Sequence, residues 1–271
     1  MNLVVVAVSS LIVLVAAQAV TYVIARRLGR YNVVDVTWGL GFVLVALVAA
    51  LAGDGSAIRE LVMLALVGVW GLRLSLHLYR RTAGKGEDPR YAALLDRHGH
   101  RPGVAIRRIF LPQGLAQWVI SLPIQISATS DATAGAGWLV LGLGVLVWTV
   151  GVIFETVGDH QLEAFRADPR NRGTVMDRGL WAWSRHPNYF GDCCVWWGIW
   201  LVAASSWPGP LTVLAPMAMT YVLVYGTGAR LLERTMSERP GYRDYQRRTA
   251  YFFPMPPRRR GTARSGQGRP S

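Results

Sequence analysis

Blocks of apolar residues alternate with short polar stretches along most of the chain. A helix needs about 20 predominantly apolar residues to cross the hydrocarbon core of a bilayer, and seven blocks approach that length. The pattern predicts membrane-spanning helices over roughly 3–25, 33–52, 58–80, 104–129, 134–157, 189–206 and 209–232. We therefore expect an all-α, polytopic membrane protein in which residues 1–257 form a single seven-helix bundle.

Basic residues follow alternate spans and so predict the orientation of the chain. The loops that follow the first, third and fifth spans are rich in Arg and Lys, and so is the tail, whereas the other loops carry almost none, with Arg59 as the exception. Positive charge collects on the cytoplasmic side of membrane proteins. The N-terminus is therefore expected outside and the C-terminus in the cytoplasm, in an integral protein of the bacterial cytoplasmic membrane.

Composition supports the same class and limits the partners. Hydrophobic residues make up 52% of the chain and charged residues 17%, which is too apolar for an ordinary soluble protein. The net charge of +13 comes mainly from the basic loops and the tail, 258–271, which is predicted to be disordered. Nucleic acid is therefore not an expected partner, and the lipid bilayer is. Cys193 and Cys194 are adjacent and lack metal-ligand spacing, so buried thiols are expected and no metal.

The string GLWAWSRHPNYFGDCCVWW passes from polar to apolar sequence without a linker. We expect a spanning helix to begin at Tyr189 or Phe190, capped by Asn188, with Asp192 in its first turn. A carboxylate so close to hydrocarbon is costly and marks a functional site. Together with His186, these side chains predict a binding site for a polar cofactor at the cytoplasmic mouth of the bundle.

Several ionisable or phenolic residues fall inside the predicted spans or at their ends: Asp35, Arg73, His77, Tyr79, Glu155 and Asp159. Ionisable groups within membranes are usually paired, so Arg73 is expected to face Asp35 or Glu155. An ion pair that only fixes helix packing is the alternative interpretation. Gln113 and Gln117 share a face of the fourth span, where interhelical hydrogen bonding is the favoured interpretation.

The second long cytoplasmic loop, 158–187, concentrates guanidinium groups, which bind phosphate through planar pairs of donors. These are Arg166, Arg170, Arg172, Arg178 and Arg185. The chain has neither GxGxxG nor GxxxxGK[ST], so a soluble dinucleotide-binding fold or a P-loop is excluded by pattern. A phosphate-bearing cofactor would be held by this Arg-rich mouth, although basic residues that only determine topology remain the alternative.

Five strings together resemble the DUF1295 membrane proteins, which are related to the C-terminal domain of the steroid 5α-reductases. The strings are GLWAWSRHPNYFGD, the WWG that follows it, LLERTMSERPGYRDYQRRTAYFFPMPP, VDVTWG around Asp35 and GEDPRY around Glu87. The resemblance extends to about Pro257. In the reductases, NADPH is held in the cytoplasmic mouth of a seven-helix bundle and hydride passes to an enone carbon of a lipid.

The resemblance implies a cofactor-binding half at about 134–257 and a set of residues that hold NADPH. Matched by motif, these are Asp159, Arg166, Arg178, Asn188, Asp192 and Tyr245. We add His186 and Tyr189 to this set because they lie in the same GLWAWSRHPNYFGDCCVWW string.

The catalytic half departs from the family pattern. The catalytic Tyr of the steroid enzymes precedes an Arg by three residues, and the corresponding position before Arg73 is Trp70, which has no phenolic proton. The proton donor is therefore expected at His77, one helical turn from Arg73, or at Tyr79. Arg73 would stabilise developing charge and Asp35 would orient Arg73.

These features predict an NADPH-dependent reductase of a C=C bond in an isoprenoid, sterol-like or acyl lipid enone. RHPNY is also similar to a string in the isoprenylcysteine carboxyl methyltransferases, so an S-adenosylmethionine-dependent membrane methyltransferase is the alternative. The many Arg residues favour NADPH over a sulfonium ligand. A non-catalytic lipid-binding membrane protein is the second alternative, and the Trp at position 70 is its best support.

Overall fold

The computed structural model describes residues 2–226 and 228–257, and these are mostly helical with no strand among them, which confirms the all-α prediction. Six helical segments of the described chain are long and apolar enough to cross a membrane: Asn2–Leu28, Val33–Ala52, Ala57–Thr82, Pro102–Ser127, Gly137–Ala167 and Gly209–Met236. The remaining predicted span, 189–206, is helix α10 (Pro187–Ala204), which is not among them. A span count of seven and the orientation stay predictions, and the tail 258–271 lies outside the described residues.

Contacts divide the chain into two compact units. The first unit comprises Met1–Val150 with Cys193–Tyr221, and the second comprises Gly151–Asp192 with the chain from Val222 onward. Helices α8 (Gly137–Ala167) and α10 each contribute one part to each unit. The predicted cofactor-binding half, 134–257, overlaps the second unit without coinciding with it.

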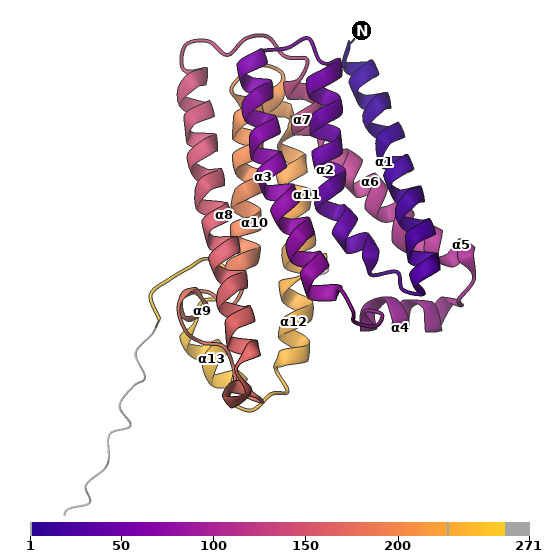
Figure 1. The fold of residues 1–271 in the computed structure, drawn as a ribbon. Helices are drawn as coiled ribbons and strands as arrows, with labels where there is room; N and C mark the ends of the chain where they lie inside the picture. The colour runs from indigo at the N-terminus through magenta and orange to yellow at the C-terminus, as the bar shows by residue number, and fades with distance from the viewer. Residues whose placement is uncertain (1, 227, 258–271) are drawn as a thin grey trace, which may run out of the picture. The chain divides into compact units, whose positions relative to one another are not determined.

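In the first unit, α1 (Asn2–Leu28), α2 (Val33–Ala52) and α3 (Ala57–Thr82) lie side by side (Figure 1). Glycine allows α2 and α3 to approach closely. A Cβ atom on Gly39 would lie 2.4 Å from the carbonyl oxygen of Gly71. Small residues at such crossings let membrane helices gain van der Waals contact that larger side chains would prevent.

The fourth predicted span is several short helices rather than one. It consists of α5 (Pro102–Ala105), the π-helix η1 (Ile106–Phe110), α6 (Leu111–Ile120) and α7 (Leu122–Ser127). Pro123 lacks a backbone N–H and so cannot donate to the carbonyl of Val119, four residues earlier, which interrupts the helical hydrogen bonds where Ser121 separates α6 from α7. The last predicted span, 209–232, is also divided into several helical pieces. It contains η3 (Gly209–Val213), α11 (Leu214–Tyr221), the π-helix η4 (Val222–Gly226) and α12 (Ala229–Met236).

The interhelical role predicted for the two glutamines is confirmed. Gln117 of α6 donates from Nε2 to the carbonyl oxygens of Thr37, at 3.1 Å, and Trp38, at 2.8 Å. Its Oε1 accepts a hydrogen bond from Gln18 of α1 at 2.8 Å. Gln113 donates to the Tyr91 hydroxyl at 3.1 Å.

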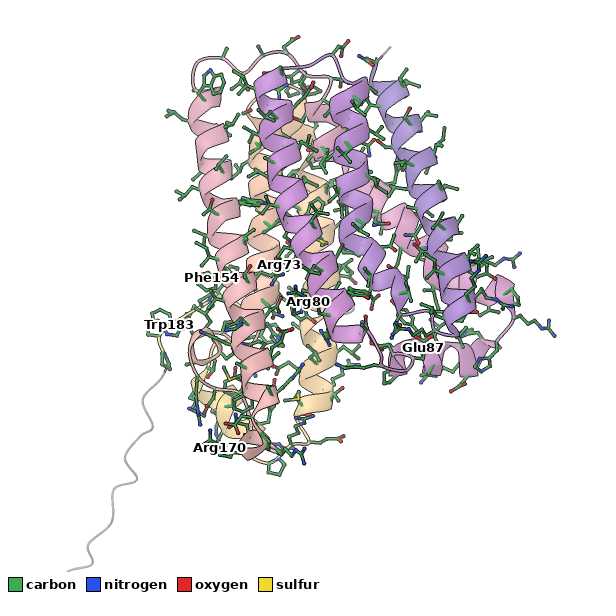
Figure 2. The ribbon with its side chains drawn as sticks, viewed as in Figure 1. Arg73, Arg80, Glu87, Phe154, Arg170 and Trp183 are labelled. Carbon is green, nitrogen blue, oxygen red and sulfur yellow. The ribbon has the colours of Figure 1, made fainter. Side chains whose placement is uncertain are left out.

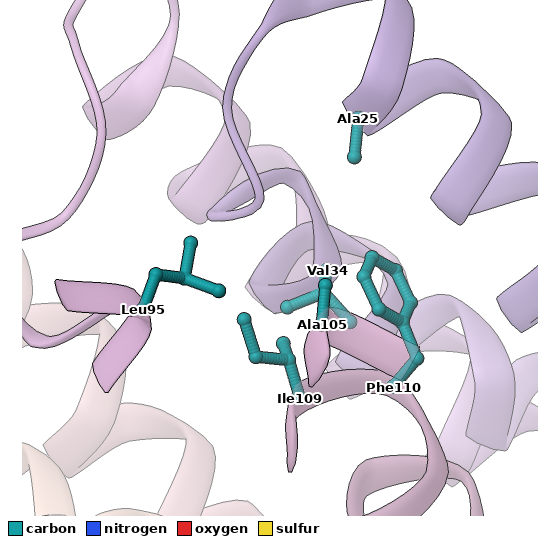
Figure 3. Packing of buried hydrophobic residues seen from close by; sticks show 6 residues of the cluster. All are labelled: Ala25, Val34, Leu95, Ala105, Ile109 and Phe110. Carbon is teal, nitrogen blue, oxygen red and sulfur yellow. The ribbon is translucent and has the colours of Figure 1, made fainter. Parts of the chain in front are cut away.

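The loop after α3 contains a helix that the apolar pattern did not predict, α4 (Pro89–His98). Asp88 caps it by accepting from the Arg90 backbone N–H at 2.8 Å. Leu95, only 4% exposed, anchors α4 in a buried apolar cluster (Figure 3). The buried members of this cluster are Ala25, Val34, Leu95, Ala105, Ile109 and Phe110. The apolar face of α4 thus holds the loop against α1, α2 and η1.

The second unit contains the C-terminal part of α8 and the first turns of α10. Its other elements are η2 (Pro169–Asn171), α9 (Leu180–Trp183), η4, α12 and α13 (Tyr242–Arg248). The predicted start of α10 at Tyr189 or Phe190, with Asn188 as its cap, is wrong, because the helix already begins at Pro187. Proline suits the first helical position, where its missing N–H is not needed. The Phe190 N–H closes the first turn by donating to the carbonyl of His186 at 3.0 Å.

Candidate functional site

The predicted site residues separate cleanly between the two units. The residues predicted to hold a cofactor all lie in the second unit: Asp159, Arg166, Arg178, His186, Asn188, Tyr189, Asp192 and Tyr245. The residues predicted to act in catalysis all lie in the first: Asp35, Arg73, His77 and Tyr79. The two groups are therefore described one after the other.

Within the second unit, the motif segment before α10 folds back onto α8. The Trp181 indole donates to the carbonyl of Gly158 at 2.9 Å, and the Leu180 N–H donates to Oε1 of Gln161, also at 2.9 Å. Gly179 has a φ of +57°, and a Cβ atom there would lie 2.5 Å from the Gln161 side chain. Glycine is the residue that tolerates both the left-handed backbone and this close approach.

The start of α10 lies directly against the C-terminal half of α8. Asn188 Nδ2 donates to Oδ1 of Asp159 at 3.0 Å, so two of the predicted cofactor residues are brought together. A Cβ atom on Gly191 would lie 2.5 Å from the backbone nitrogen of Glu155, which leaves no room for a side chain between the helices. Asp159 is 8% exposed and Asp192 is 7% exposed, so both carboxylates are buried.

Glu233 of α12 accepts hydrogen bonds from side chains of two other segments, the one before α10 and helix α13. It accepts hydrogen bonds from Arg185 at 2.8 Å, His186 at 3.1 Å, Tyr242 at 2.7 Å and Gln246 at 2.6 Å. We call these five residues the Glu233 cluster. A carboxylate can only accept, so Nε2 of His186 carries the proton in this contact. Glu233 was not among the predicted site residues. A Glu next to Arg234 in LLERTMSERPGYRDYQ has no pattern that separates it from a solvated charge.

His186 is enclosed as well as hydrogen-bonded. Its side chain is 3% exposed, its ring stacks on Tyr189 with centroids 5.9 Å apart, and the ring of Tyr251 meets it edge-on at 5.4 Å. Arg185 lies over the face of Tyr251 at 5.2 Å. The RHPNY string thus packs aromatic and charged side chains together, and the hydrogen bonds of the Glu233 cluster hold Arg185 and His186 in position.

Tyr245 has a structural role, and its contact with a cofactor stays a prediction. Its side chain is 2% exposed, and its hydroxyl donates to the carbonyl of Trp181 at 2.6 Å. Burial raises the pKa of Tyr245 well above its ordinary value. The chain after α13 lies against the segment between α9 and α10. The Arg185 N–H donates to the carbonyl of Ala250, and Ser184 Oγ donates to that of Phe252.

The arginines of the 158–187 loop are largely open to solvent. Arg166, Arg172 and Arg178 are exposed, as a phosphate-binding role requires. Arg170, labelled in Figure 2, is exposed too, but it is engaged by Asp168 at 2.8 Å next to the short helix η2. Because Arg170 is exposed in the same loop but is held by Asp168, a substitution of Arg170 can serve as the control for one of Arg178.

The predicted catalytic residues of the first unit do not form one group. Arg73, labelled in Figure 2, and His77 are half-buried on α3, whereas Tyr79 is 57% exposed. Of the two carboxylates predicted to face Arg73, Asp35 has other partners, and the pairing with Glu155 stays a prediction. The Asp35 carboxylate accepts from the Tyr91 hydroxyl at 2.5 Å and forms an ion pair with Arg90 at 3.3 Å. The unpredicted helix α4 supplies both partners.

Tyr91 gives the first unit a phenol beside a carboxylate, which the sequence analysis did not identify. Its hydroxyl donates to Asp35 and accepts from Gln113. Burial, followed by the neighbouring charge of Asp35, raises the pKa of Tyr91 well above its ordinary value, so the phenol keeps its proton. The GEDPRY string was the available signal, but without α4 nothing placed its tyrosine near Asp35.

Comparisons with known proteins give family membership without an activity. No solved structure matches the chain significantly. An uncharacterised protein of Schizosaccharomyces pombe is 26% identical over 220 residues, which cover 72% of this chain and 63% of that relative. The chain thus spans less than two thirds of the relative's length. The model of a family described as "Protein of unknown function (DUF1295)" matches residues 21–249, and the chain therefore belongs to the DUF1295 family.

Proposed function

We propose that this protein is an NADPH-dependent membrane reductase that saturates the C=C bond of a lipid-like enone. One observation carries the proposal: the Asn188–Asp159 hydrogen bond of 3.0 Å, which joins the start of α10 to the C-terminal half of α8 within one unit. Residues from two separate segments that the steroid 5α-reductase resemblance implies for NADPH thereby meet. The apolar helices fit a bilayer environment, from which a lipid-like substrate would enter.

The donor set of the second unit suits a phosphate-bearing cofactor. Arg166 and Arg178 are exposed and carry permanently charged, planar donors that can grip phosphate oxygens in pairs. Asn188 and Asp192 offer amide and carboxylate groups for ribose or nicotinamide contacts. The Glu233 cluster holds His186 and the backbone around it rigid, so these groups require little reordering on binding. NADPH, when bound, supplies a hydride.

The first unit supplies the groups that manage charge and protons. Addition of hydride to an enone places negative charge on the carbonyl oxygen, which needs a cation or a proton donor nearby. Arg73 and His77 lie one turn apart on α3, so the guanidinium stabilises the oxygen while His77 holds the proton to be delivered. Tyr91, whose phenol is positioned by Asp35 and Gln113, is the second candidate donor.

The binding step is tested by calorimetric titration of the purified protein with NADPH, NADH and S-adenosylmethionine. Wild type should bind NADPH most tightly. Asn188→Ala, Asp192→Ala and Arg178→Ala should each weaken binding about tenfold or more, as expected for loss of a hydrogen bond to a charged group. Arg170→Ala is the matched control and should bind as wild type does. Binding of S-adenosylmethionine without NADPH would replace the proposal with the methyltransferase alternative, and binding of neither would favour a non-catalytic lipid-binding protein.

The catalytic step is tested by NADPH oxidation with a panel of lipid enones. His77→Ala should lower turnover at least a hundredfold on any enone that the wild type reduces, as loss of a general acid does. Tyr79→Phe, at an exposed position of the same helix, tests the other donor expected from the sequence and should keep full activity if His77 is the donor. If His77→Ala is fully active and Tyr91→Phe is not, the proton donor is Tyr91.

A further inference from the structure

A groove between α1 and α6 lies wholly within the first unit, and none of the residues assigned above to cofactor or catalysis lines it. Its volume is about 390 Å³, within the range of roughly 300–1,000 Å³ that is typical of small-molecule sites. Apolar side chains form most of its wall, among them Val15, Ala19, Tyr22, Phe110, Leu111 and Leu115. Val15, Leu111 and Leu115 are about half exposed on membrane-spanning segments, so the groove opens towards lipid.

Gln18 places an amide in this apolar wall, and its orientation is determined by its neighbours. Gln117 must direct its nitrogen towards the carbonyls of Thr37 and Trp38, because an amide nitrogen only donates. Its oxygen therefore faces Gln18 and accepts from Gln18 Nε2 at 2.8 Å. Gln18 in turn keeps its own oxygen, Oε1, as an acceptor.

The Gln18 oxygen is a buried acceptor that needs a donor. The side chain is 8% exposed, and Oε1 accepts a hydrogen bond from no residue in 2–226 or 228–257. A buried acceptor left unpaired costs about 1–3 kcal/mol, so a ligand that donates to it gains a comparable advantage. Gly114 keeps space open beside it, because a Cβ atom at that position would lie 3.3 Å from Gln18 Cγ.

We propose that the groove binds an uncharged lipid-like alcohol, with the apolar chain along α1 and α6 and the hydroxyl donating to Gln18 Oε1. Gln18 lies ten residues before the end of α1 at Leu28, about 15 Å along the helix axis. Burial of a charged headgroup at that depth would cost much free energy, whereas a single hydroxyl that donates to the Gln18 oxygen would not. This site does not depend on the proposed reductase activity.

The test compares two probes, the isoprenoid alcohol farnesol and its methyl ether, which has a similar chain but no donor. Each is titrated against the purified full chain in detergent, and the bound mass is followed by native mass spectrometry. Wild type should bind farnesol about tenfold more tightly than the ether. Gln18→Leu should remove this preference and retain binding of the ether.

A matched pair of variants locates the binding. Ala19→Phe fills the groove and should weaken binding of both probes at least tenfold. Ala16→Phe puts the same side chain on an exposed position of α1 that does not line the groove, and it should bind as wild type does. Equal affinity of wild type for alcohol and ether would overturn the proposal, and so would wild-type binding by Ala19→Phe. Neither of these two results depends on Gln18→Leu folding correctly.

Discussion

At the scale of single residues, Glu233 is the common acceptor for four side chains of the second unit. Its side chain is 14% exposed and that of its ion-pair partner Arg185 is 11% exposed. Glu233→Gln keeps the volume but removes the charge, so a largely buried guanidinium loses its counter-ion. We expect a loss of about 3 kcal/mol in unfolding free energy, as is typical when a buried pair is broken. Thermal or denaturant unfolding in detergent would measure it.

The control for Glu233 is Arg247→Gln, which weakens the exposed ion pair with Asp244 on α13. Exposed pairs contribute little, so its stability should stay within about 0.5 kcal/mol of wild type. An equal loss in both variants would mean that the Glu233 cluster has no special structural role.

Tyr245 separates a structural role from a cofactor-binding one. Tyr245→Phe deletes the hydroxyl that donates to the Trp181 carbonyl and leaves that carbonyl without this bond. We expect a loss of about 1 kcal/mol in stability, with the NADPH affinity of the folded protein unchanged. Unfolding and titration of the same preparation would measure both. A large loss of affinity at unchanged stability would instead support the role expected from the sequence.

Individual residues were predictable where a motif and a helix position agreed. Asn188 lies in the first turn of α10 and Asp159 in the C-terminal half of α8, where the apolar sequence of each predicted span gives way to polar residues. The partners of Asp35 were not predicted because α4, which supplies Tyr91 and Arg90, is short and polar, and its apolar face carries few residues. Glu233 was missed because its four donors come from segments that only the folded chain brings together.

At the scale of elements, the loop before α4 caps another helix. The Glu87 carboxylate accepts from the backbone N–H groups of Tyr31 and Asn32, the latter at 2.9 Å, and so satisfies free donors at the start of α2. Figure 2 labels Glu87 beside α4. Glu87→Ala should destabilise this junction by about 1–2 kcal/mol, as removal of a helix cap does.

Hydrogen exchange of the peptide that contains Tyr31 and Asn32 would measure the effect, with exchange at least fivefold faster in Glu87→Ala. Asp96→Ala is the control on α4, because the Asp96–His100 pair is 69% exposed on both sides. Its exchange should match wild type. Unchanged exchange in Glu87→Ala would show that the cap contributes nothing to the α2 terminus.

The cap of α4 should depend on pH. Burial raises the pKa of the Asp88 carboxyl, but hydrogen bonds from the Arg90 side chain and backbone outweigh it and hold the pKa below its ordinary value of 3.8. A depressed folded-state pKa gives stability that is present above the ordinary value and is lost as pH falls through the folded value. Hydrogen exchange of α4, corrected for intrinsic rates, should therefore accelerate below about pH 4. Asp88→Asn should abolish this pH step.

Helix existence was predictable from the sequence, and helix continuity was not. Apolar blocks long enough to span a bilayer are visible without any structure. The breaks at Ser121 and the π-helical turns at Ile106–Phe110 and Val222–Gly226 depend on how prolines and side chains pack against neighbouring helices. The start of α10 was predicted too late in the chain, because Pro187 was assigned to the end of the preceding loop although proline also suits the first position of a helix.

At the scale of the whole molecule, Arg59 was the exception to the charge pattern that predicts the orientation, and the structure explains it. Its side chain is fully buried and donates to Ser127, Ser130, Asp131 and Thr133. The guanidinium thus connects the start of α3 to the turn after α7. Because Arg59 acts in helix packing, its charge does not indicate which side of the membrane its loop occupies. The other basic loops then agree on one orientation.

We therefore predict that the N-terminus faces outward and the C-terminus faces the cytoplasm. Arg26, Arg27 and Arg30 and the later basic loops then lie on one side, where positive charge is retained during insertion. A reporter fused to the C-terminus that is active only in the cytoplasm should be active, and an alkaline phosphatase fusion, active only outside, should be silent. Arg59→Gln should leave both readings unchanged and lower stability, because its charge acts in packing. An outward C-terminus in wild type would contradict the orientation, and a reversal caused by Arg59→Gln would contradict the structural role assigned to that residue.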